Sequence, residues 1–285
     1  MDNLNYRNNF PINTNVHFDK ERLFFNKWEM YKLLTPYKLP FHIPYTNFLS
    51  RQSIDLFTTR QISFYIKPVD TWAGKHISLI TPFDKGYIIQ QPNGADEFHP
   101  NKEALIQVLV HHYSRMHAII QQRAPLLPFD SRAFDIRVHL QRDENGFWLY
   151  AGDLIRIGGE KAIVSNLFTK GGGVVETDFV LNKVLDSYQV NLVKENLAKS
   201  AFSIANLLDY YYYFIDIGAD FGIDQKGNLW LLEVNTNDKV GKPAYDLFKK
   251  LPDKTVYKQM IAKDKKRKKI WSRDRGTGTL SQNRI

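Results

Sequence analysis

The segment FIDIGADFGIDQKGNLWLLEVN, residues 214–235, contains the most informative pattern in this chain. Two apolar runs of strand length flank the polar sequence QKGN, which is typical of an antiparallel hairpin. A turn centred on that polar sequence places Asp220 directly opposite Glu233, and Asn235 follows on the same face two residues later. The pattern therefore predicts a hairpin with three oxygen-bearing side chains on one face.

These three side chains indicate a cation site. Two carboxylates that face each other repel, and burying them unpaired costs several kcal/mol, so a cation between them is a natural remedy. Oxygen ligands suit Mg²⁺ or Mn²⁺, and Mg²⁺ commonly combines one or two carboxylates with substrate phosphates. Asp220, Glu233 and Asn235 alone leave such an ion incompletely coordinated. This indicates a nucleotide whose phosphates complete the shell, although a hairpin with solvated acids explains the same residues.

Three basic residues on other predicted strands suit a phosphate ligand. Lys67 closes an alternating strand in FYIKP and precedes a flap around Gly74. In FDIRVHLQ, Asp135 and Arg137 alternate with apolar residues and share one face, and Arg156 in LIRIGG points the same way from the partner strand. A pair of arginines stabilises the charge that develops on a transferring phosphoryl group. A structural Asp–Arg pair is the alternative.

Composition sets limits on the class of protein. The chain has 285 residues, 43% hydrophobic and 24% charged, which is ordinary for a globular protein and excludes wholesale disorder and fibrous repeats. It has no cysteine, which excludes disulfides, zinc–thiolate sites and a thiol nucleophile. No apolar stretch reaches the ~18 residues of a spanning helix, and MDNLNYRNNF lacks the layout of a signal peptide. We therefore expect a cytoplasmic protein with no membrane partner.

The formal net charge of +9 is concentrated near the end of the chain. Residues 251–285 contain eleven of the 39 basic and three of the 30 acidic residues, so residues 1–250 are nearly neutral. A basic run followed by Gly, Thr, Ser and Asn predicts a solvated, partly flexible tail. Such a tail would bind nucleic acid only non-specifically and in a salt-sensitive way.

Hydrophobic periodicity predicts strands, helices and antiparallel hairpins in an α+β architecture of two lobes. The expected elements are a helix over residues 19–35, an extended link over 36–44, strands over 62–67 and within 75–92, a helix from Asn101, a strand at 119–120, a hairpin turning at 144–146, and the longest helix over 190–212.

Five motifs occur in a characteristic order along the chain. They are the strand lysine in IKP, the strand IIQQ, the strand pair FDIRV and LIRIGG, the sequence SNLFTKGGG, and Asp220 followed thirteen residues later by Glu233-Val-Asn235. In this order the chain resembles the ATP-grasp superfamily, and most closely its YheC/YheD-like group of sporulation-associated bacterial proteins. The resemblance runs from about Asn26 to Ala244 and implies an ATP-grasp fold in which two α+β lobes clamp ATP.

The resemblance implies a role in nucleotide binding for several residues. Lys67, with Lys75 from the flap, would contact the phosphates. Gln121 and Gln122 lie where ATP-grasp enzymes bind adenine between the lobes. Asn166 would lie beside the γ-phosphate and the acceptor.

The resemblance also implies a reaction. Asp220, Glu233 and Asn235 match the Mg²⁺ ligands of the superfamily, in agreement with the hairpin register, and Mn²⁺ suits the same ligands. Arg137 and Arg156 would be catalytic, holding the acylphosphate that forms when a carboxylate attacks the γ-phosphorus of ATP. An amine then displaces phosphate. The implied enzyme is therefore an ATP-dependent carboxylate–amine ligase that forms a carbon–nitrogen bond and releases ADP and phosphate.

The implied domain organisation leaves little or no amino-terminal domain before the ATP-grasp domain. The parts are an irregular lead (1–25), the ATP-grasp domain (26–250) with a smaller lobe at about 60–122 and a larger lobe at about 123–250, and the basic tail (251–285). A partner chain or a large substrate would then supply the missing acceptor-binding part. The alternative function is a catalytically weak nucleotide-binding or structural protein of the spore, because residues 70–77 are poorer in glycine than the flap of the family.

Overall fold

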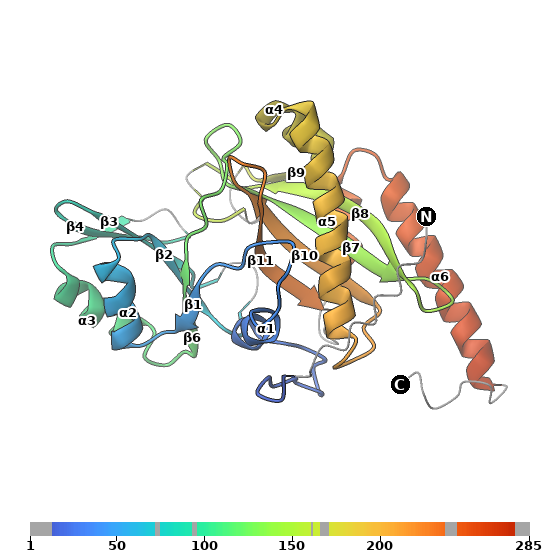
Figure 1. The fold of residues 1–285 in the computed structure, drawn as a ribbon, viewed down its shortest axis with the longest axis horizontal. Helices are drawn as coiled ribbons and strands as arrows, with labels where there is room; N and C mark the ends of the chain where they lie inside the picture. Colours follow the sequence, from blue (N-terminus) through green and yellow to red (C-terminus); the bar gives the residue numbers. More distant parts are fainter. Residues whose placement is uncertain are drawn as a thin grey trace.

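The computed structural model describes residues 13–71, 75–92, 96–160, 162–165, 171–236 and 244–276. Two antiparallel sheets stand side by side, one of six strands and one of five, each with helices packed on it (Figure 1). We call these units the smaller and the larger lobe, and they form the α+β architecture that the sequence predicts. Within the residues described, no helix is both long and apolar enough to cross a bilayer.

The smaller lobe contains a sheet in the order β1-β6-β2-β3-β4-β5. The strands are β1 (Thr46–Phe48), β2 (Phe64–Pro68), β3 (Ser78–Phe83), β4 (Gly86–Gln90), β5 (Asp96–His99) and β6 (Ala118–Gln122). Helices α2 (Arg51–Thr59) and α3 (Lys102–His112) bury Ile54 and Leu105 against this sheet. Strand β1 and helix α2 were not predicted from the sequence, and with β1 the sheet of the smaller lobe begins earlier in the chain than residue 60.

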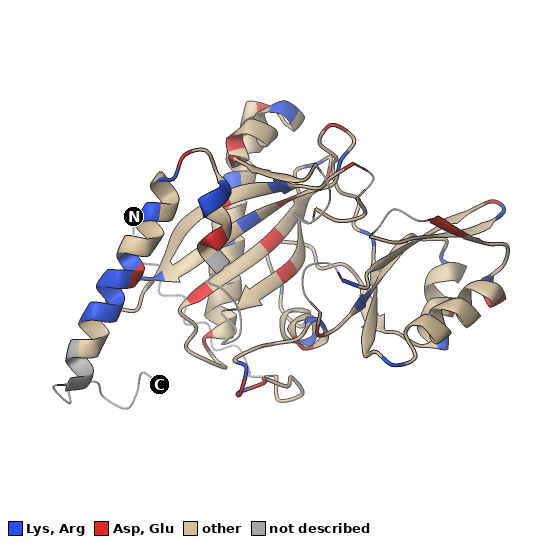
Figure 2. Cartoon of the chain, turned by 180° about the vertical axis from the view of Figure 1, so that it is seen from behind, with Lys and Arg blue, Asp and Glu red and all other residues tan. Residues whose placement is uncertain are grey.

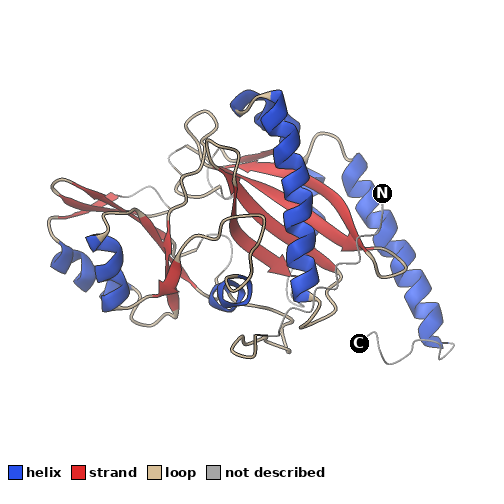
Figure 3. Cartoon of the chain, in the orientation of Figure 1, coloured by secondary structure: helices blue, strands red, loops and turns tan. Residues whose placement is uncertain are grey.

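The larger lobe contains a sheet in the order β11-β10-β7-β8-β9. The strands are β7 (Phe134–Arg142), β8 (Trp148–Ile157), β9 (Gly173–Val175), β10 (Asp216–Ile223) and β11 (Leu229–Thr236). Helices α4 (Thr177–Val184) and α5 (Ser187–Leu208) lie on one side, whereas the 3₁₀ helix η1 (Ala244–Lys250) and helix α6 (Thr255–Gly276) lie on the other (Figure 3). The hairpin at 144–146 is confirmed as the β7–β8 pair. The helix predicted over 190–212 is present as α5, but it ends at Leu208, and α6 is equally long.

Strand β7 shows how alternation gives the larger sheet two different faces. Ile136, Val138 and Leu140 belong to the apolar core that α5 covers. Asp135 and Arg137 alternate with them and therefore lie on the opposite face. Seen from behind, that face has charged bands across its strands (Figure 2).

Strands β10 and β11 form the predicted hairpin. Asp220 pairs with Glu233, as predicted. Nearer the turn Phe221 pairs with Leu231, so Leu232 is the extra residue of a β-bulge. The turn is therefore shifted by half a residue from its predicted centre, while the pairing of the two carboxylates is confirmed.

Helix α1 (Lys27–Leu34) lies between the two lobes (Figure 1). The side chain of Asn26 accepts hydrogen bonds from the backbone N–H groups of Trp28 and Glu29 and so caps the helix. The sequence predicts a helix from residue 19, but the helix begins at Lys27. Leu23 has a φ of 57°, which a right-handed helix excludes.

Residues 255–276, which the composition predicts to be part of a flexible tail, form helix α6. Met260 and Arg267 on this helix are almost fully buried. Trp271 Nε1 donates a hydrogen bond to the backbone oxygen of Glu144 at 2.9 Å, which ties the helix to the β7–β8 turn. The expectation of a tail therefore does not hold for these residues, and the residues beyond 276 lie outside the described part of the chain.

Candidate functional site

A cleft lies where α1, the sheet of the smaller lobe and the edge strand β11 meet. Its polar lining consists of Lys27, Lys67, Gln121, Glu233 and Asn235, and apolar side chains from α1 and β11 surround these groups. Four of the five are residues that the sequence predicts for nucleotide or metal binding. The fold thus brings residues from both lobes into one cleft.

Lys67 lies on β2 and is held by the neighbouring strands. Its Nζ donates to Gln121 Oε1 at 2.6 Å, and Gln121 Nε2 donates to Thr46 Oγ1 at 3.0 Å. Burial lowers the pKa of Lys67 to about 8, with Glu233 opposing the shift and Lys27 adding to it. An anion in the cleft would therefore stabilise the charged form of Lys67.

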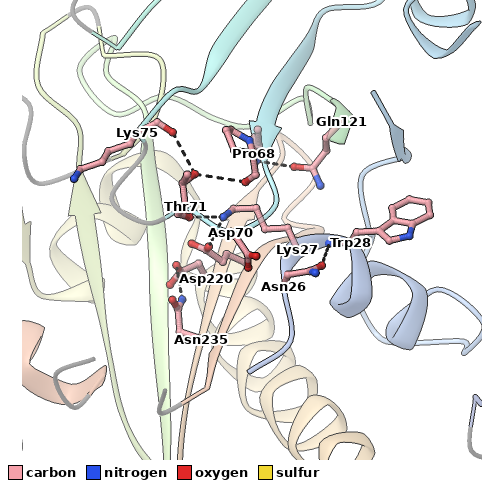
Figure 4. A network of polar contacts seen from close by, with 12 residues as sticks. Asn26, Lys27, Trp28, Pro68, Asp70, Thr71, Lys75, Gln121, Asp220 and Asn235 are labelled. Atoms are coloured by element: carbon pink, nitrogen blue, oxygen red, sulfur yellow. Dashed lines mark hydrogen bonds and ion pairs between the residues drawn. The ribbon is translucent and has the colours of Figure 1, made fainter. Parts of the chain in front are cut away.

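Lys27 is a residue of the cleft that the sequence analysis did not select. Its Nζ donates to the backbone oxygen of Thr71 at 2.6 Å and lies 3.7 Å from Glu233 Oε1 (Figure 4). It thereby joins α1, the segment after β2 and the larger lobe. A signal was present in the sequence, because Asn26 followed three residues later by Glu29 is typical of a helix that starts at Lys27.

Two arginines and two aspartates form a closed group of ion pairs, which we call the Arg–Asp cluster (Asp135, Arg137, Arg156 and Asp220). Arg156 Nε and Nη2 donate to the two oxygens of Asp135 at 2.7 and 2.8 Å, and Nη2 also lies 2.7 Å from Asp220 Oδ2. Arg137 binds Asp220 through Nε and Nη2, the latter at 2.9 Å. Asn235 Nδ2 is a fourth donor to Asp220, at 3.3 Å.

Strand pairing positions this cluster. Asp135 lies opposite Arg156 across β7 and β8, and Arg137 lies opposite Asp220 across β7 and β10. A Cβ on Gly218 would lie 3.2–3.4 Å from the side chain of Arg137, so a glycine there leaves room for Arg137 to lie across β10. The predicted face with two arginines is present, and both arginines are in Asp–Arg pairs, as the structural alternative expects.

The cluster is electrically neutral when its four groups are ionised. Burial raises the pKa of Asp135, although Arg156 opposes this. Burial acts in the same direction on Asp220, but Arg137 and Arg156 outweigh it and the pKa is lowered. Burial disfavours the charge on Arg156, and the two aspartates more than restore it, so its pKa is raised. Asp220 is therefore the firmly ionised acid of the cluster.

The predicted metal ligands fit a divalent cation only in part. Glu233 and Asn235 line the cleft and present oxygens to it, as Mg²⁺ or Mn²⁺ requires, with phosphates to complete the shell. Asp220 has both oxygens engaged by arginines. Among the residues that the structure describes, no group of three or more His, Cys, Asp or Glu side chains could hold a metal ion. Asp220 fits a cation only if its arginines move.

Two predicted residues of the described chain, Gln122 and Lys75, belong neither to this polar lining nor to the Arg–Asp cluster. Gln122 Oε1 accepts a hydrogen bond from the backbone N–H of Tyr45 at 3.3 Å, at the junction of β6 with the segment before β1. Lys75 is exposed, and its side chain extends away from the contact of Lys27 with the loop (Figure 4). Asn166 lies outside the described residues. Within the described part of the chain, no contact of Gln122 or Lys75 with the cleft supports their predicted roles.

Comparison with known proteins gives a family and two curated relatives. A family model described as YheC/D-like ATP-grasp matches residues 15–264. The endospore coat-associated protein YheD of Bacillus subtilis (strain 168) is 30% identical over 226 residues, which cover 75% of this chain and 48% of that protein. The endospore coat-associated protein YheC of the same strain is 22% identical over 221 residues, which cover 73% and 56%. The chain thus spans about half the length of the curated relatives it matches.

A solved structure is also similar. The crystal structure of the D-cycloserine synthetase DcsG is 12% identical to this chain, with a TM-score of 0.47, and the match covers 83% of this chain and 69% of the synthetase.

Proposed function

Since this chain belongs to the YheC/D-like ATP-grasp family, we propose that it binds ATP in the cleft and uses it to join a carboxylate to an amine. The observation that most supports this proposal is the meeting of Lys27, Lys67, Glu233 and Asn235 in one cleft beside the Arg–Asp cluster. Ammonium groups suit phosphates, oxygens suit Mg²⁺ or Mn²⁺, and a pair of guanidinium groups suits a transferring phosphoryl group.

In the proposed complex, Lys67 binds a phosphate of ATP through its ammonium group. When Lys67 binds phosphate, it no longer donates its hydrogen bond to Gln121 Oε1. That oxygen then accepts a hydrogen bond from the adenine amino group. Mg²⁺ held by Glu233 and Asn235 neutralises phosphate charge when it is bound. We also propose that Lys75 contacts the phosphates and that Gln122 contacts adenine. Asn166 is proposed to lie beside the γ-phosphate.

The proposed chemistry needs charge and position but no nucleophilic side chain. A carboxylate oxygen of the acceptor attacks the γ-phosphorus, the bond to the β–γ bridging oxygen breaks, and ADP leaves. The amine nitrogen then attacks the acyl carbon, the carbon–oxygen bond to phosphate breaks, and the nitrogen loses a proton. Arg137 and Arg156 hold the phosphoryl oxygens through both steps. The absence of cysteine is compatible with this route.

Replacing Glu233 with alanine tests the proposed site. We expect wild type to bind ATP with Mg²⁺ in calorimetry, and Glu233→Ala to weaken this binding by at least the ~10–100-fold that even outer-shell partners of a metal site contribute. Glu103→Ala, at an exposed ion pair on α3, is the matched control and should bind as wild type does. ADP release that requires an added carboxylate supports the ligase. Wild type that binds no nucleotide would contradict the proposal.

The setting of the reaction is also a proposal. Because both curated relatives are named as endospore coat-associated, we place this chain in the cytoplasm of a spore-forming cell, in association with the spore. The carboxylate acceptor and the amine donor are unidentified, and we propose that a partner chain contributes to binding the acceptor. Nucleotide binding without ADP release, across a panel of carboxylates and amines, would instead favour the catalytically weak nucleotide-binding protein.

Nucleotide affinity is expected to fall as the pH rises through about 8, because Lys67 loses its proton there. A bound phosphate favours the charged lysine and raises its pKa, so binding above pH 8 takes up a proton, whereas binding well below it does not. Calorimetry at pH 9 in buffers of different ionisation enthalpy measures this uptake. Lys67→Arg stays charged throughout and should bind without it. Wild type with an affinity independent of pH would refute this role of Lys67.

A further inference from the structure

The carboxylate of Asp220 is buried beneath its hydrogen-bonding partners. It is 1% exposed and accepts three contacts from the guanidinium groups of Arg137 and Arg156 and one from the amide of Asn235. Three of these contacts fall on Oδ2 and one on Oδ1, and the fork of Arg137 spans both oxygens. A cation therefore reaches Asp220 only by displacing a guanidinium group.

The charges around the cleft also disfavour a cation that arrives alone. With its groups ionised, the described site contains four positive and three negative side chains, namely Lys27, Lys67, Arg137 and Arg156 against Asp135, Asp220 and Glu233. The net charge of these side chains is positive, so the site attracts a polyanion and repels a free dication.

A phosphate chain can take the arginines without leaving either guanidinium group unpaired. Guanidinium groups bind phosphate with the same forked geometry that they use for carboxylate. Arg156 keeps Asp135 through Nε and Nη2 when it turns from Asp220 to a phosphate. Arg137 exchanges the carboxylate of Asp220 for a phosphate. The exchange frees the oxygens of Asp220 at the moment when a second negative ligand, the phosphate, is beside them.

We propose that a divalent cation binds fully at this site only after a phosphate chain has drawn Arg137 and Arg156 away from Asp220. This inference rests on the proposed nucleotide site and adds an order of binding to it, with phosphates first and the cation second. Asp220 then joins Glu233 and Asn235 as the third oxygen donor. The site therefore excludes free cations. The arginines bind the phosphates before the metal ion binds.

Binding of Mn²⁺ in the absence of any nucleotide tests this order, because the paramagnetic resonance signal of free Mn²⁺ is lost on binding. We expect Arg156→Gln and Arg137→Gln each to bind Mn²⁺ at least about tenfold more tightly than wild type, since each removes one positive charge beside the ion. Two variants are used so that a failure of one to fold leaves the other. Arg51→Gln, at an exposed ion pair of the smaller lobe, should match wild type. Equal Mn²⁺ affinity in wild type and both cluster variants would overturn the proposal.

Titration with ADP in EDTA separates this inference from the proposed function. Wild type is expected to bind ADP without any cation, and adenosine, which has no phosphate, should not promote Mn²⁺ binding. ADP binding that occurs only when Mg²⁺ is present would overturn the order of binding and leave the proposed function standing. The proposed function itself fails if ADP binds in neither condition.

Discussion

Replacing Asp220 with alanine is expected to lower the free energy of unfolding by about 3–5 kcal/mol, because it leaves buried guanidinium charge without its partner. Arg137 is 5% exposed and loses the carboxylate that binds both of its donor groups. Arg156 remains paired with Asp135, so its charge contributes less to the loss of stability. A loss of this size corresponds to a fall of about 6–20 °C in Tm. Urea denaturation and differential scanning calorimetry measure the two quantities.

The control for this prediction is an exposed ion pair. Asp178→Ala removes a carboxylate that faces Lys194 at the surface, and such pairs contribute about 0–1 kcal/mol. The double variant Asp220→Ala with Arg137→Met removes the unpaired charge as well, so it should recover part of the lost stability. If Asp220→Ala costs no more than Asp178→Ala, the Arg–Asp cluster does not stabilise the larger lobe.

The part of the site that depends on strand alternation could be predicted from the sequence. Asp220 faces Glu233 because both lie on strands of a hairpin with a recognisable polar turn. The bulge at Leu232 could not be predicted, since nothing in the local sequence marks which strand takes an extra residue. The prediction is correct at the two carboxylates because the bulge compensates for the shifted turn.

Pairing between distant elements was beyond sequence reasoning. The alternation in β7 predicts that Asp135 and Arg137 share a face, but the partner of each belongs to a different neighbouring strand, β8 or β10. The strand order that decides this is a property of the whole sheet. Lys27 was missed for a similar reason, because its contacts with Thr71 and Glu233 are made across the interface of the lobes.

Helix α6 shows how composition can conceal a packing face. Met260, Asp264, Arg267 and Trp271 recur at helical spacing and face the larger lobe. Two of these four residues are charged, so a hydropathy pattern does not identify them as buried. Their charges are compensated locally, because Arg267 pairs with Asp264 and donates to the backbone oxygen of Arg142 at 2.9 Å. The lysines at other positions of α6 make the overall composition of this segment basic.

Ending the chain after Lys254, and so removing α6, is expected to abolish the folded, soluble protein. Met260 forms a small core with Leu154, Phe248 and Leu251 between α6, η1 and β8. Each fully buried apolar side chain contributes about 1.5–3 kcal/mol, so loss of this core approaches the ~5–15 kcal/mol that stabilises a whole domain. The fraction of the truncated chain recovered as soluble protein, with its circular dichroism and cooperative unfolding, measures the effect.

Two single substitutions distinguish the packing of α6 from its charge. Met260→Ala leaves a cavity under the helix and should cost about 2–5 kcal/mol, whereas Lys265→Ala, at an exposed position, should change stability by less than ~0.5 kcal/mol. A truncated chain as stable as wild type, or equal effects of the two substitutions, would mean that α6 contributes no core. If both expectations hold, the basic residues of α6 project from a fixed helix, so their spacing follows the helical repeat rather than the average dimensions of a flexible tail.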